Sequence, residues 1–162
     1  MNTRQPNHEA IPQAVFLEKA RTYCAYSERC VQDMRQKLRQ WECPSQYIAP
    51  IIRQLEQENF INEERYVRTF IRSKLNQNKW GLHKILFALR QKNIPESLIQ
   101  LCHSELDTDE YVQTLREIIQ SKRIKEDNPY KLKVKLASYA IQKGFQAELV
   151  WNILNETTDH ST

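Results

Sequence analysis

One apolar pattern occurs three times in this chain, each copy fifty-one residues after the last. Residues 31–52 read VQDMRQKLRQWECPSQYIAPII, residues 82–103 read LHKILFALRQKNIPESLIQLCH, and residues 133–154 read KVKLASYAIQKGFQAELVWNIL. When the copies are stacked, six sets of apolar residues coincide: Met34, Ile85 and Leu136; Leu38, Leu89 and Ala140; Cys43, Ile94 and Phe145; Tyr47, Leu98 and Leu149; Ile48, Ile99 and Val150; and Ile51, Cys102 and Ile153. A repeat of this length is typical of tandem helical units that stack on one another.

The spacing within each copy predicts two amphipathic helices joined by a tight turn. The apolar residues lie four apart, then break, and then continue at intervals of one, three and four, which is a helical period on either side of a turn. Pro44 and Pro95 stand where the second helix of a copy would begin, a position that tolerates the missing N–H of proline. Gly144 occupies the turn of the third copy.

A further helix is predicted before each pair. Residues 62–70 (NEERYVRTF) open with the cap residue Asn62 and two acids, and they share Tyr-Val-x-Thr with residues 107–115 (DTDEYVQTL). The offset here is forty-five, so the third copy has about six extra residues before its helix pair. They fall in SKRIKEDNPYK, where Asn128 and Pro129 predict a helix start. The leading helix of the first copy is expected near residues 14–26.

These patterns together predict an all-α chain, an elongated and curved array of three tandem three-helix repeats. The expected boundaries are a disordered tail over 1–13, repeats over 14–61, 62–106 and 107–157, and a second tail over 158–162. A content of only 2 glycines agrees with helix. No apolar run approaches the roughly 18 residues of a membrane span, and no signal-peptide-like block follows the N-terminus. A cytoplasmic location without membrane contact is therefore expected.

The residue types that carry catalysis or hold metals show no useful spacing. The four cysteines, Cys24, Cys30, Cys43 and Cys102, lack CxxC or Cys/His ligand spacing. Each falls in a predicted helical stretch beside apolar neighbours, so we expect reduced side chains that pack in the core or at its boundary. The carboxylates are not paired, Ser and His form no plausible triad, and no Gly-rich phosphate loop is present. We therefore expect no enzyme activity, no metal and no cofactor.

Between residues 65 and 95 the chain has no acidic residue. This window holds eight basic residues: Arg65, Arg68, Arg72, Lys74, Lys79, Lys84, Arg90 and Lys92. Such a stripe suits a polyanion or an acidic protein surface, and it equally suits helix faces that are simply solvated. Trp80 is open to two interpretations: an exposed ring beside lysines can stack on a base or a partner side chain, and a buried one can fill the gap between two repeats. Trp41 and Trp151, in apolar company, are expected to pack inside or between repeats.

Two stretches of the chain resemble the RecX family of recombinase regulators. Residues 64–94, ERYVRTFIRSKLNQNKWGLHKILFALRQKNI, are similar to the central signature of that family: an acidic–Arg–aromatic start, a basic arm, a Gly-containing turn and a basic helix. Residues 30–61, CVQDMRQKLRQWECPSQYIAPIIRQLEQENFI, look like its first unit. The resemblance runs from about Phe16 to Leu154. The Lys-Trp-Gly turn and the long third loop suggest a divergent branch, similar to that of the Bacteroidetes.

The resemblance implies a partner and no reaction. RecX-like proteins bind the RecA recombinase filament on single-stranded DNA and lie in its helical groove. They inhibit its ATP turnover, its strand exchange and its stimulation of SOS-repressor self-cleavage. The resemblance thus implies a monomeric regulator of DNA repair and the SOS response whose partner is the RecA filament, with a further contact to single-stranded DNA. The contact candidates that match the signature are Arg65, Arg68, Arg72, Lys74, Lys79, Lys84 and Arg90, and the charge pattern adds Trp80 and Lys92.

The sequence departs from the family pattern in three places. Asn93 replaces the usual Gly at the end of the signature, and Leu82 follows the turn glycine in place of Pro. The uncharged residues 86–88 reduce the number of basic side chains on the basic helix. Asn tolerates a left-handed turn, so the first departure need not disturb the fold. The last leads us to expect that the arm over residues 65–79 matters more for binding. Two rival functions stay open, namely direct binding of single-stranded DNA and a scaffold for an unrelated protein.

Overall fold

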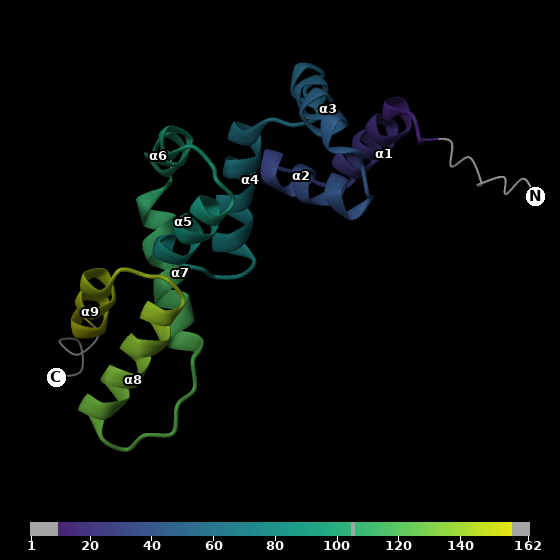
Figure 1. The fold of residues 1–162 in the computed structure, drawn as a ribbon. Helices are drawn as coiled ribbons and strands as arrows, with labels where there is room; N and C mark the ends of the chain where they lie inside the picture. Colours follow the sequence, from purple (N-terminus) through teal and green to yellow (C-terminus); the bar gives the residue numbers. More distant parts are fainter. Residues whose placement is uncertain (1–9, 105, 157–162) are drawn as a thin grey trace, which may run out of the picture. The chain divides into compact units, whose positions relative to one another are not determined.

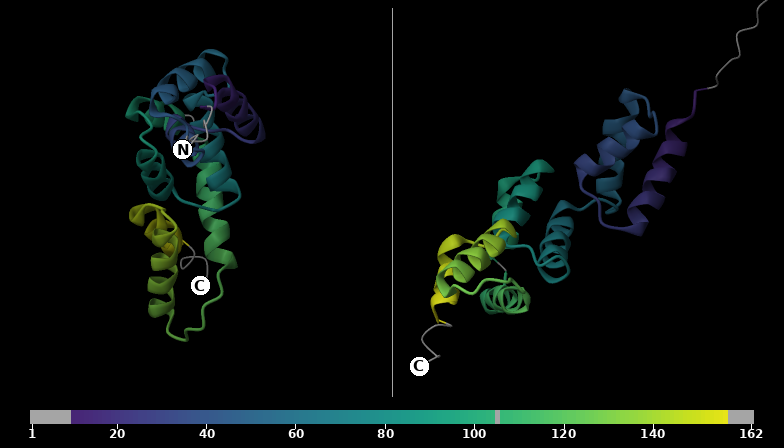
Figure 2. Two further views of the ribbon diagram at one scale, coloured as in Figure 1. Left: turned by 45° about the vertical axis from the view of Figure 1, so that its right-hand side comes forward. Right: turned by 90° about the horizontal axis from the view of Figure 1, so that it is seen from below.

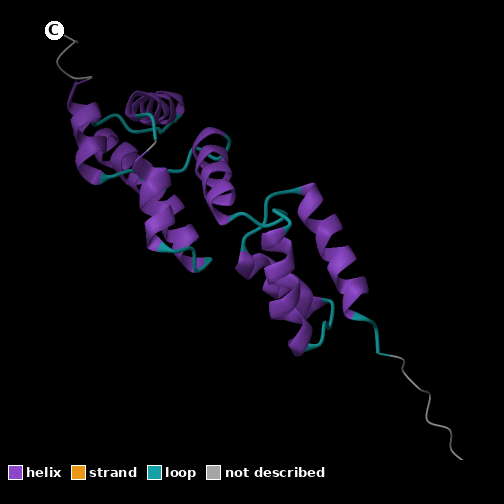
Figure 3. Ribbon diagram, turned by 90° about the horizontal axis from the view of Figure 1, so that it is seen from above, coloured by secondary structure: helices purple, strands orange, loops and turns teal. Residues whose placement is uncertain are grey.

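The computed structural model describes residues 10–104 and 106–156, and all regular structure in these residues is helical (Figures 1 and 3). Nine helices follow one another there: α1 (Gln13–Tyr26), α2 (Val31–Gln40), α3 (Ser45–Gln57), α4 (Glu63–Asn76), α5 (Leu82–Gln91), α6 (Glu96–Ser104), α7 (Thr108–Ser121), α8 (Pro129–Gln142) and α9 (Ala147–Glu156). The predicted all-α fold is confirmed, and α1 begins one residue before the predicted first repeat. The elongated, curved arrangement stays a prediction, and residues 1–9 and 158–162 of the predicted tails lie outside the described residues.

The chain divides into two compact units, residues 1–66 and 67–162, and the division falls inside α4. In the first unit, α1 and α2 both pack against α3. In the second unit, α5 packs against α6, and α8 contacts both α7 and α9 (Figure 2). None of the helices in the described parts of the chain is long and apolar enough to cross a membrane.

The apolar residues that repeat every fifty-one positions are confirmed as core positions. Four of the six sets are buried in every copy, namely those that begin with Leu38, Cys43, Ile48 and Ile51. Leu136 is half-buried where its two counterparts are buried, and the set that begins with Tyr47 is half-buried throughout. Because burial of one Leu or Ile side chain contributes about 1.5–3 kcal/mol, these positions supply much of the stability of each helix pair.

The same left-handed turn joins the paired helices in all three copies. Glu42, Asn93 and Gly144, again fifty-one residues apart, have φ angles of 58°, 54° and 102°. In each turn the N–H of the next residue donates to the carbonyl five positions before it, at 3.0, 3.3 and 3.2 Å. This bond is the mark of a Schellman helix ending. Glycine enters the left-handed region freely, whereas a residue with a Cβ does so at a cost of roughly 1 kcal/mol.

Side-chain caps begin the helices where the sequence predicts them. Asn62 and Asn128 each accept a hydrogen bond at 3.0 Å from the N–H three residues further along, and Pro129 is the first helical residue after Asn128. Pro44 and Pro95 differ slightly from the prediction. Each immediately precedes the first residue of its helix, so these prolines end the turn and do not begin the helix.

The cysteines pack as predicted but not all of them are helical. Three of the four are buried and Cys24 is half-buried, and burial raises the pKa of the Cys24 thiol to about 11. Cys30 is the N-cap of α2, where its Sγ accepts a hydrogen bond from the Asp33 N–H at 3.4 Å. Cys43 lies in the turn between α2 and α3. Among the described residues, no three His, Cys, Asp or Glu side chains are placed to hold a metal ion.

A backbone contact between the two glycines of the chain joins the second and third repeats inside the second unit. Gly81 precedes α5 and Gly144 lies in the α8–α9 turn, and a Cβ on Gly81 would lie 2.2 Å from the Gly144 carbonyl carbon. The Gly81 N–H donates to the Lys143 carbonyl at 2.7 Å, and the His83 N–H donates to the Gly144 carbonyl at 2.9 Å. The carbonyls of Lys143 and Gly144, just after α8, thus cap the positively polarised start of α5.

The Tyr111 side chain of α7 completes this cap. Its hydroxyl accepts a hydrogen bond from the Leu82 N–H at 3.0 Å and donates one to the Gln146 side-chain oxygen at 2.6 Å. Its ring stacks on Phe145 with 5.1 Å between ring centroids. Burial raises the pKa of the Tyr111 hydroxyl to about 12, so it stays a donor throughout the ordinary pH range.

Two ion pairs connect distant parts of the first unit. The Arg21 guanidinium binds the Glu58 carboxylate through two hydrogen bonds of 2.7 and 2.8 Å, and Arg65 Nε lies 2.6 Å from Glu28 Oε1. The hydrogen bonds from Arg21 and Gln54 lower the pKa of the Glu58 carboxyl from 4.5 to about 2. The charged form of Glu58 is therefore the form that the folded unit favours.

We expect Glu42→Gly to raise the free energy of unfolding of the first unit by about 1 kcal/mol, because glycine removes the strain of the left-handed turn. Glu42 is exposed, so little else changes. Urea denaturation followed by circular dichroism measures the effect. The control Gln40→Gly, in the last turn of α2, should destabilise instead. Equal effects of the two changes would contradict this account.

We expect Gly81→Ala to lower the free energy of unfolding of the second unit by roughly 2–3 kcal/mol, because the new methyl group would overlap backbone atoms that have no room to shift. The matched control His83→Ala changes an exposed side chain two residues further on. It should stay within about 0.5 kcal/mol of the parent protein. Denaturant melts of both variants test this, and a Gly81→Ala protein as stable as the control would refute the close glycine contact.

The Arg21–Glu58 pair predicts a dependence of stability on acid. Because the pKa of Glu58 is lowered on folding, its contribution is complete above pH 4.5 and is lost as the pH falls from 4.5 toward 2. The variant Glu58→Gln should therefore lose less stability than the parent over this interval. Thermal melts at several pH values measure it, with Glu42→Gln as a control that removes an exposed carboxylate. A parent-like acid profile for Glu58→Gln would contradict the assignment.

Candidate partner and nucleic-acid interface

The Trp80 ring in the α4–α5 loop lies between two of the predicted lysines. The Nζ atoms of Lys74 and Lys84 are 4.8 and 4.5 Å from the centroid of its ring. Lys74 also lies 5.4 Å from the Phe70 ring, and its carbonyl accepts a hydrogen bond from the Trp80 N–H at 3.0 Å. The ring is half-buried, and these contacts lie within the second repeat. Both roles predicted for this ring, stacking on a partner and filling a gap between repeats, stay predictions.

A second aromatic ring with two lysines lies on the third repeat. The Lys122 and Lys143 Nζ atoms are 4.4 and 5.8 Å from the Tyr139 ring centroid. Lys143 Nζ also donates a hydrogen bond of 3.1 Å to the carbonyl of Asn78, two residues before Trp80. Lys143 therefore connects the two groups of side chains. We call them together the lysine–aromatic surface, which consists of Lys74, Trp80, Lys84, Lys122, Tyr139 and Lys143.

Ammonium groups held over aromatic rings are suited to bind anions. Each cation–π contact is worth about 0.5–1 kcal/mol at an exposed site and limits the positions of a side chain that is otherwise free to move. The same ammonium group keeps hydrogen atoms to donate to a phosphate or a carboxylate. Lysines and aromatic rings on one face are also the usual composition of surfaces that bind single-stranded nucleic acid.

Several of the other predicted residues already have acidic partners within the protein. Arg65 pairs with Glu28, and its Nη2 donates to the Asn59 carbonyl at 3.0 Å. Arg90 Nη2 lies 2.8 Å from Glu96 Oε1, and this guanidinium holds the pKa of the Glu96 carboxyl below its usual value. Lys79 Nζ lies 3.8 Å from the Glu117 carboxylate. Their roles in partner binding stay predictions, and the structure assigns each an intramolecular contact.

Arg68 and Arg72 line a hollow of about 180 Å³ between α4 and the start of α7. Asp107 and Glu110 line the same hollow, so these carboxylates offset part of its positive charge. Lys92 lies at the opposite end of α5 from Lys84, where it is the C-cap residue. The structure therefore brings Lys74, Trp80 and Lys84 together and places the other predicted contacts elsewhere.

Sequence reasoning did not find the contributions of Tyr139 and Lys143. Lys143 lies 65 positions after Asn78, to which it is hydrogen-bonded, and no local pattern reports a contact over that distance. The one available signal is its place beside Gly144 in the repeated turn. That signal reveals a role only when the turn is known to lie against Gly81.

Tandem three-helix repeats define a helical-repeat protein. Residues 62–101 match a family model described as RecX, second three-helix domain. The chain is 28% identical over 131 residues to the regulatory protein RecX of Clostridium acetobutylicum and 31% identical over 135 residues to that of Streptococcus agalactiae serotype V. It is 26% identical over 141 residues to that of Prosthecochloris aestuarii. Over most of its length the chain is therefore similar to proteins of the RecX family.

These matches cover 77%, 82% and 86% of this chain but different shares of its relatives. The chain spans 60% of the Clostridium protein and 51% of the Streptococcus protein, and it spans 91% of the Prosthecochloris protein. A crystal structure of regulatory protein RecX has the same fold, with a TM-score of 0.80 at 22% identity over 88% of this chain and 73% of that one. The crystal structure of RecX from Lactobacillus salivarius gives a TM-score of 0.77 at 21% identity over 89% and 95%.

Proposed function

We propose that this protein is a negative regulator of the RecA recombinase. In this proposal it binds in the groove of the RecA filament as a cytoplasmic monomer and inhibits ATP hydrolysis, strand exchange and the coprotease activity. It thereby modulates DNA repair and the SOS response. The observation that carries the proposal is the similarity, over most of the chain, to proteins named regulatory protein RecX.

The lysine–aromatic surface supports this proposal by its charge. Lys74, Lys84 and Lys122 present ammonium groups beside aromatic rings, and such groups suit an acidic protein face or the DNA backbone inside a filament. A chain of repeats can contact more than one protomer of a filament. Such a contact would block the addition of protomers or hold neighbouring protomers in an unproductive arrangement.

The test is the ATP hydrolysis of the cognate RecA on single-stranded DNA while this protein is titrated in. We expect the rate to fall at substoichiometric protein. The double variant Lys74→Gln, Lys84→Gln should need a roughly tenfold higher concentration for half-inhibition, since each lost charge contact is worth about 0.7 kcal/mol. The control Lys125→Gln, Lys131→Gln changes two exposed lysines outside this surface by the same net charge.

Two results would count against the proposal in different ways. An unchanged ATPase rate, with filament formation verified by electron microscopy, would refute regulation by this route. If the Lys74→Gln, Lys84→Gln double variant still inhibits as strongly as the parent, the protein is a regulator of RecA, but the lysine–aromatic surface does not contribute to the inhibition.

A second candidate function is direct binding of single-stranded DNA, which the aromatic rings among the lysines favour. Under this alternative, the isolated protein binds oligo(dT) with an affinity that falls steeply with salt. A plot of log affinity against log salt concentration would be less steep by about 1–2 in the Lys74→Gln, Lys84→Gln double variant. The absence of oligo(dT) binding at low salt would exclude this function.

A further inference from the structure

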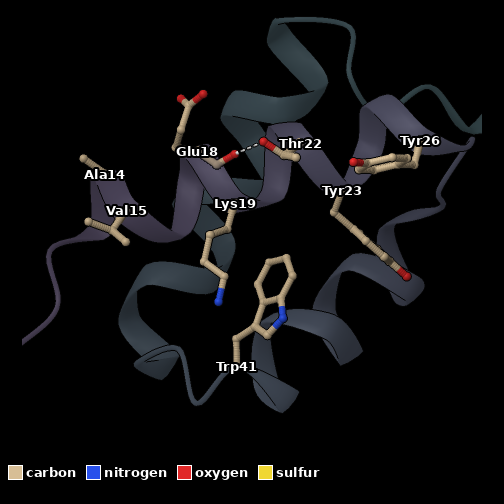
Figure 4. Close-up of a pocket in the computed structure, with 8 residues that line it drawn as sticks. All are labelled: Ala14, Val15, Glu18, Lys19, Thr22, Tyr23, Tyr26 and Trp41. Carbon is tan, nitrogen blue, oxygen red and sulfur yellow. Dashed lines mark hydrogen bonds between the residues drawn. The ribbon is translucent and has the colours of Figure 1, made fainter.

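The first unit carries an apolar groove that the proposed function does not use. The groove has a volume of about 810 Å³ and runs along α1 beside the end of α2 (Figure 4). Its lining consists of Ala14, Val15, Glu18, Lys19, Thr22, Tyr23, Tyr26 and Trp41. Phe16, Leu17 and Ala20 of the same helix are buried in the core of the unit. Helix α1 therefore presents apolar side chains on two opposite faces, and only one of these faces is covered by the unit itself.

Large apolar side chains are exposed along this groove. Val15 is 46% exposed and Tyr26 is 83% exposed. A single exposed apolar side chain is ordinary, but two that line one apolar hollow mark a surface suited to a partner. Trp41, which the sequence suggested as a packing residue, is half-buried and forms the wall of the groove that faces α1 (Figure 4).

Cations are held at the aromatic wall of the groove. Lys19 Nζ lies 4.5 Å from the Trp41 ring centroid, and Lys37 Nζ lies 5.7 Å from it and 5.2 Å from the Tyr23 ring centroid. Arg29 Cζ lies 3.9 Å from the Tyr23 ring centroid. These side chains are therefore positioned before any partner arrives, which lowers the entropy that binding must remove.

Three cations, Lys19, Arg29 and Lys37, lie over the aromatic rings of the groove, whose lining holds one acid, Glu18. Within the described residues, neither Lys19 nor Lys37 has a carboxylate within ion-pair distance. Glu18, the acidic residue in the lining, is already paired with Arg21 at 3.1 Å. An occupant that matches the groove therefore has an apolar surface flanked by negative charge.

We propose that this groove binds a short segment of a partner protein that carries apolar side chains flanked by Asp or Glu. The apolar side chains of such a segment would cover Val15 and Tyr26, and its carboxylates would pair with Lys19 and Lys37. A nucleic acid fits less well, because it offers no aliphatic surface to cover the exposed side chain of Val15.

The test is the selection of random peptides of about 12 residues, displayed on phage, against the full-length protein. We expect the enriched peptides to combine Leu, Phe or Trp with Asp or Glu. Synthetic copies should bind the parent protein in fluorescence anisotropy. Lys19→Glu and Val15→Asp should each weaken this binding at least roughly tenfold, as is usual for central contacts of an interface.

The chain offers a matched control for each variant. Arg53→Glu reverses an exposed charge on α3, and Ala49→Asp places an acid at an exposed position of the same helix. Neither should change peptide binding. All four positions are exposed, so circular dichroism is expected to show unchanged helix content, and this measurement separates loss of binding from loss of fold.

Three results would overturn the proposal. The first is a selection that enriches no peptide, or only peptides without acidic residues. The second is peptide binding that Lys19→Glu and Val15→Asp leave unchanged. The third is competition by oligo(dT) for the selected peptides, which would assign the groove to nucleic acid. None of these readouts uses the recombinase, so failure here leaves the proposed regulatory function untouched.

Discussion

The start of α5 rests against the α8–α9 turn, and the organisation of the second unit depends on this contact. The N–H groups of Gly81, Leu82 and His83 have no partners within α5, and all three are satisfied by the third repeat. A buried N–H without an acceptor costs about 1–3 kcal/mol. The two repeats therefore cannot separate without exposing these groups, and both glycines are needed because neither backbone has room for a Cβ beside the other.

The same contact gives the lysine–aromatic surface its continuity. Trp80 is the neighbour of Gly81 in the chain, and Lys143 is the neighbour of Gly144. When the glycines meet, Lys143 is brought to the Asn78 carbonyl and the two aromatic rings with their lysines become parts of one surface. The contact between the two glycines thus both joins the repeats and brings the parts of the lysine–aromatic surface together. Substitutions at either glycine are therefore expected to affect the stability of the second unit and this surface.

Local features of the fold were predictable from sequence because local physics sets them. Most of the repeated apolar residues of each helix pair follow the helical period and are buried, and Asn62 and Asn128 cap the helices that they precede. Asn93, which stands where the family pattern has glycine, takes the left-handed turn that asparagine was expected to tolerate. Each of these features depends on residues within a few positions of one another, which is the range over which sequence patterns are informative.

The charge pattern was less informative because acids outside the acid-free window lie close to its basic residues in space. The window over residues 65–95 contains no acid, yet Arg65, Lys79 and Arg90 all pair with carboxylates from outside it. No local sequence pattern indicates that the two glycines, which are sixty-three positions apart, are in contact. Sequence could list the basic residues, and only the fold separates those that have internal partners from Lys74 and Lys84, which lie on the Trp80 ring.

Native-state hydrogen exchange by NMR at the amides of Gly81, Leu82 and His83 tests the central contact most directly. If the α8–α9 turn caps α5, these three amides should exchange only when the whole second unit unfolds. Their exchange free energies should then equal that of a core amide such as Leu115. Gly144→Ala should lower all of them together. Exchange of the three amides at the rate of an unstructured peptide, with the core amides still protected, would contradict the account.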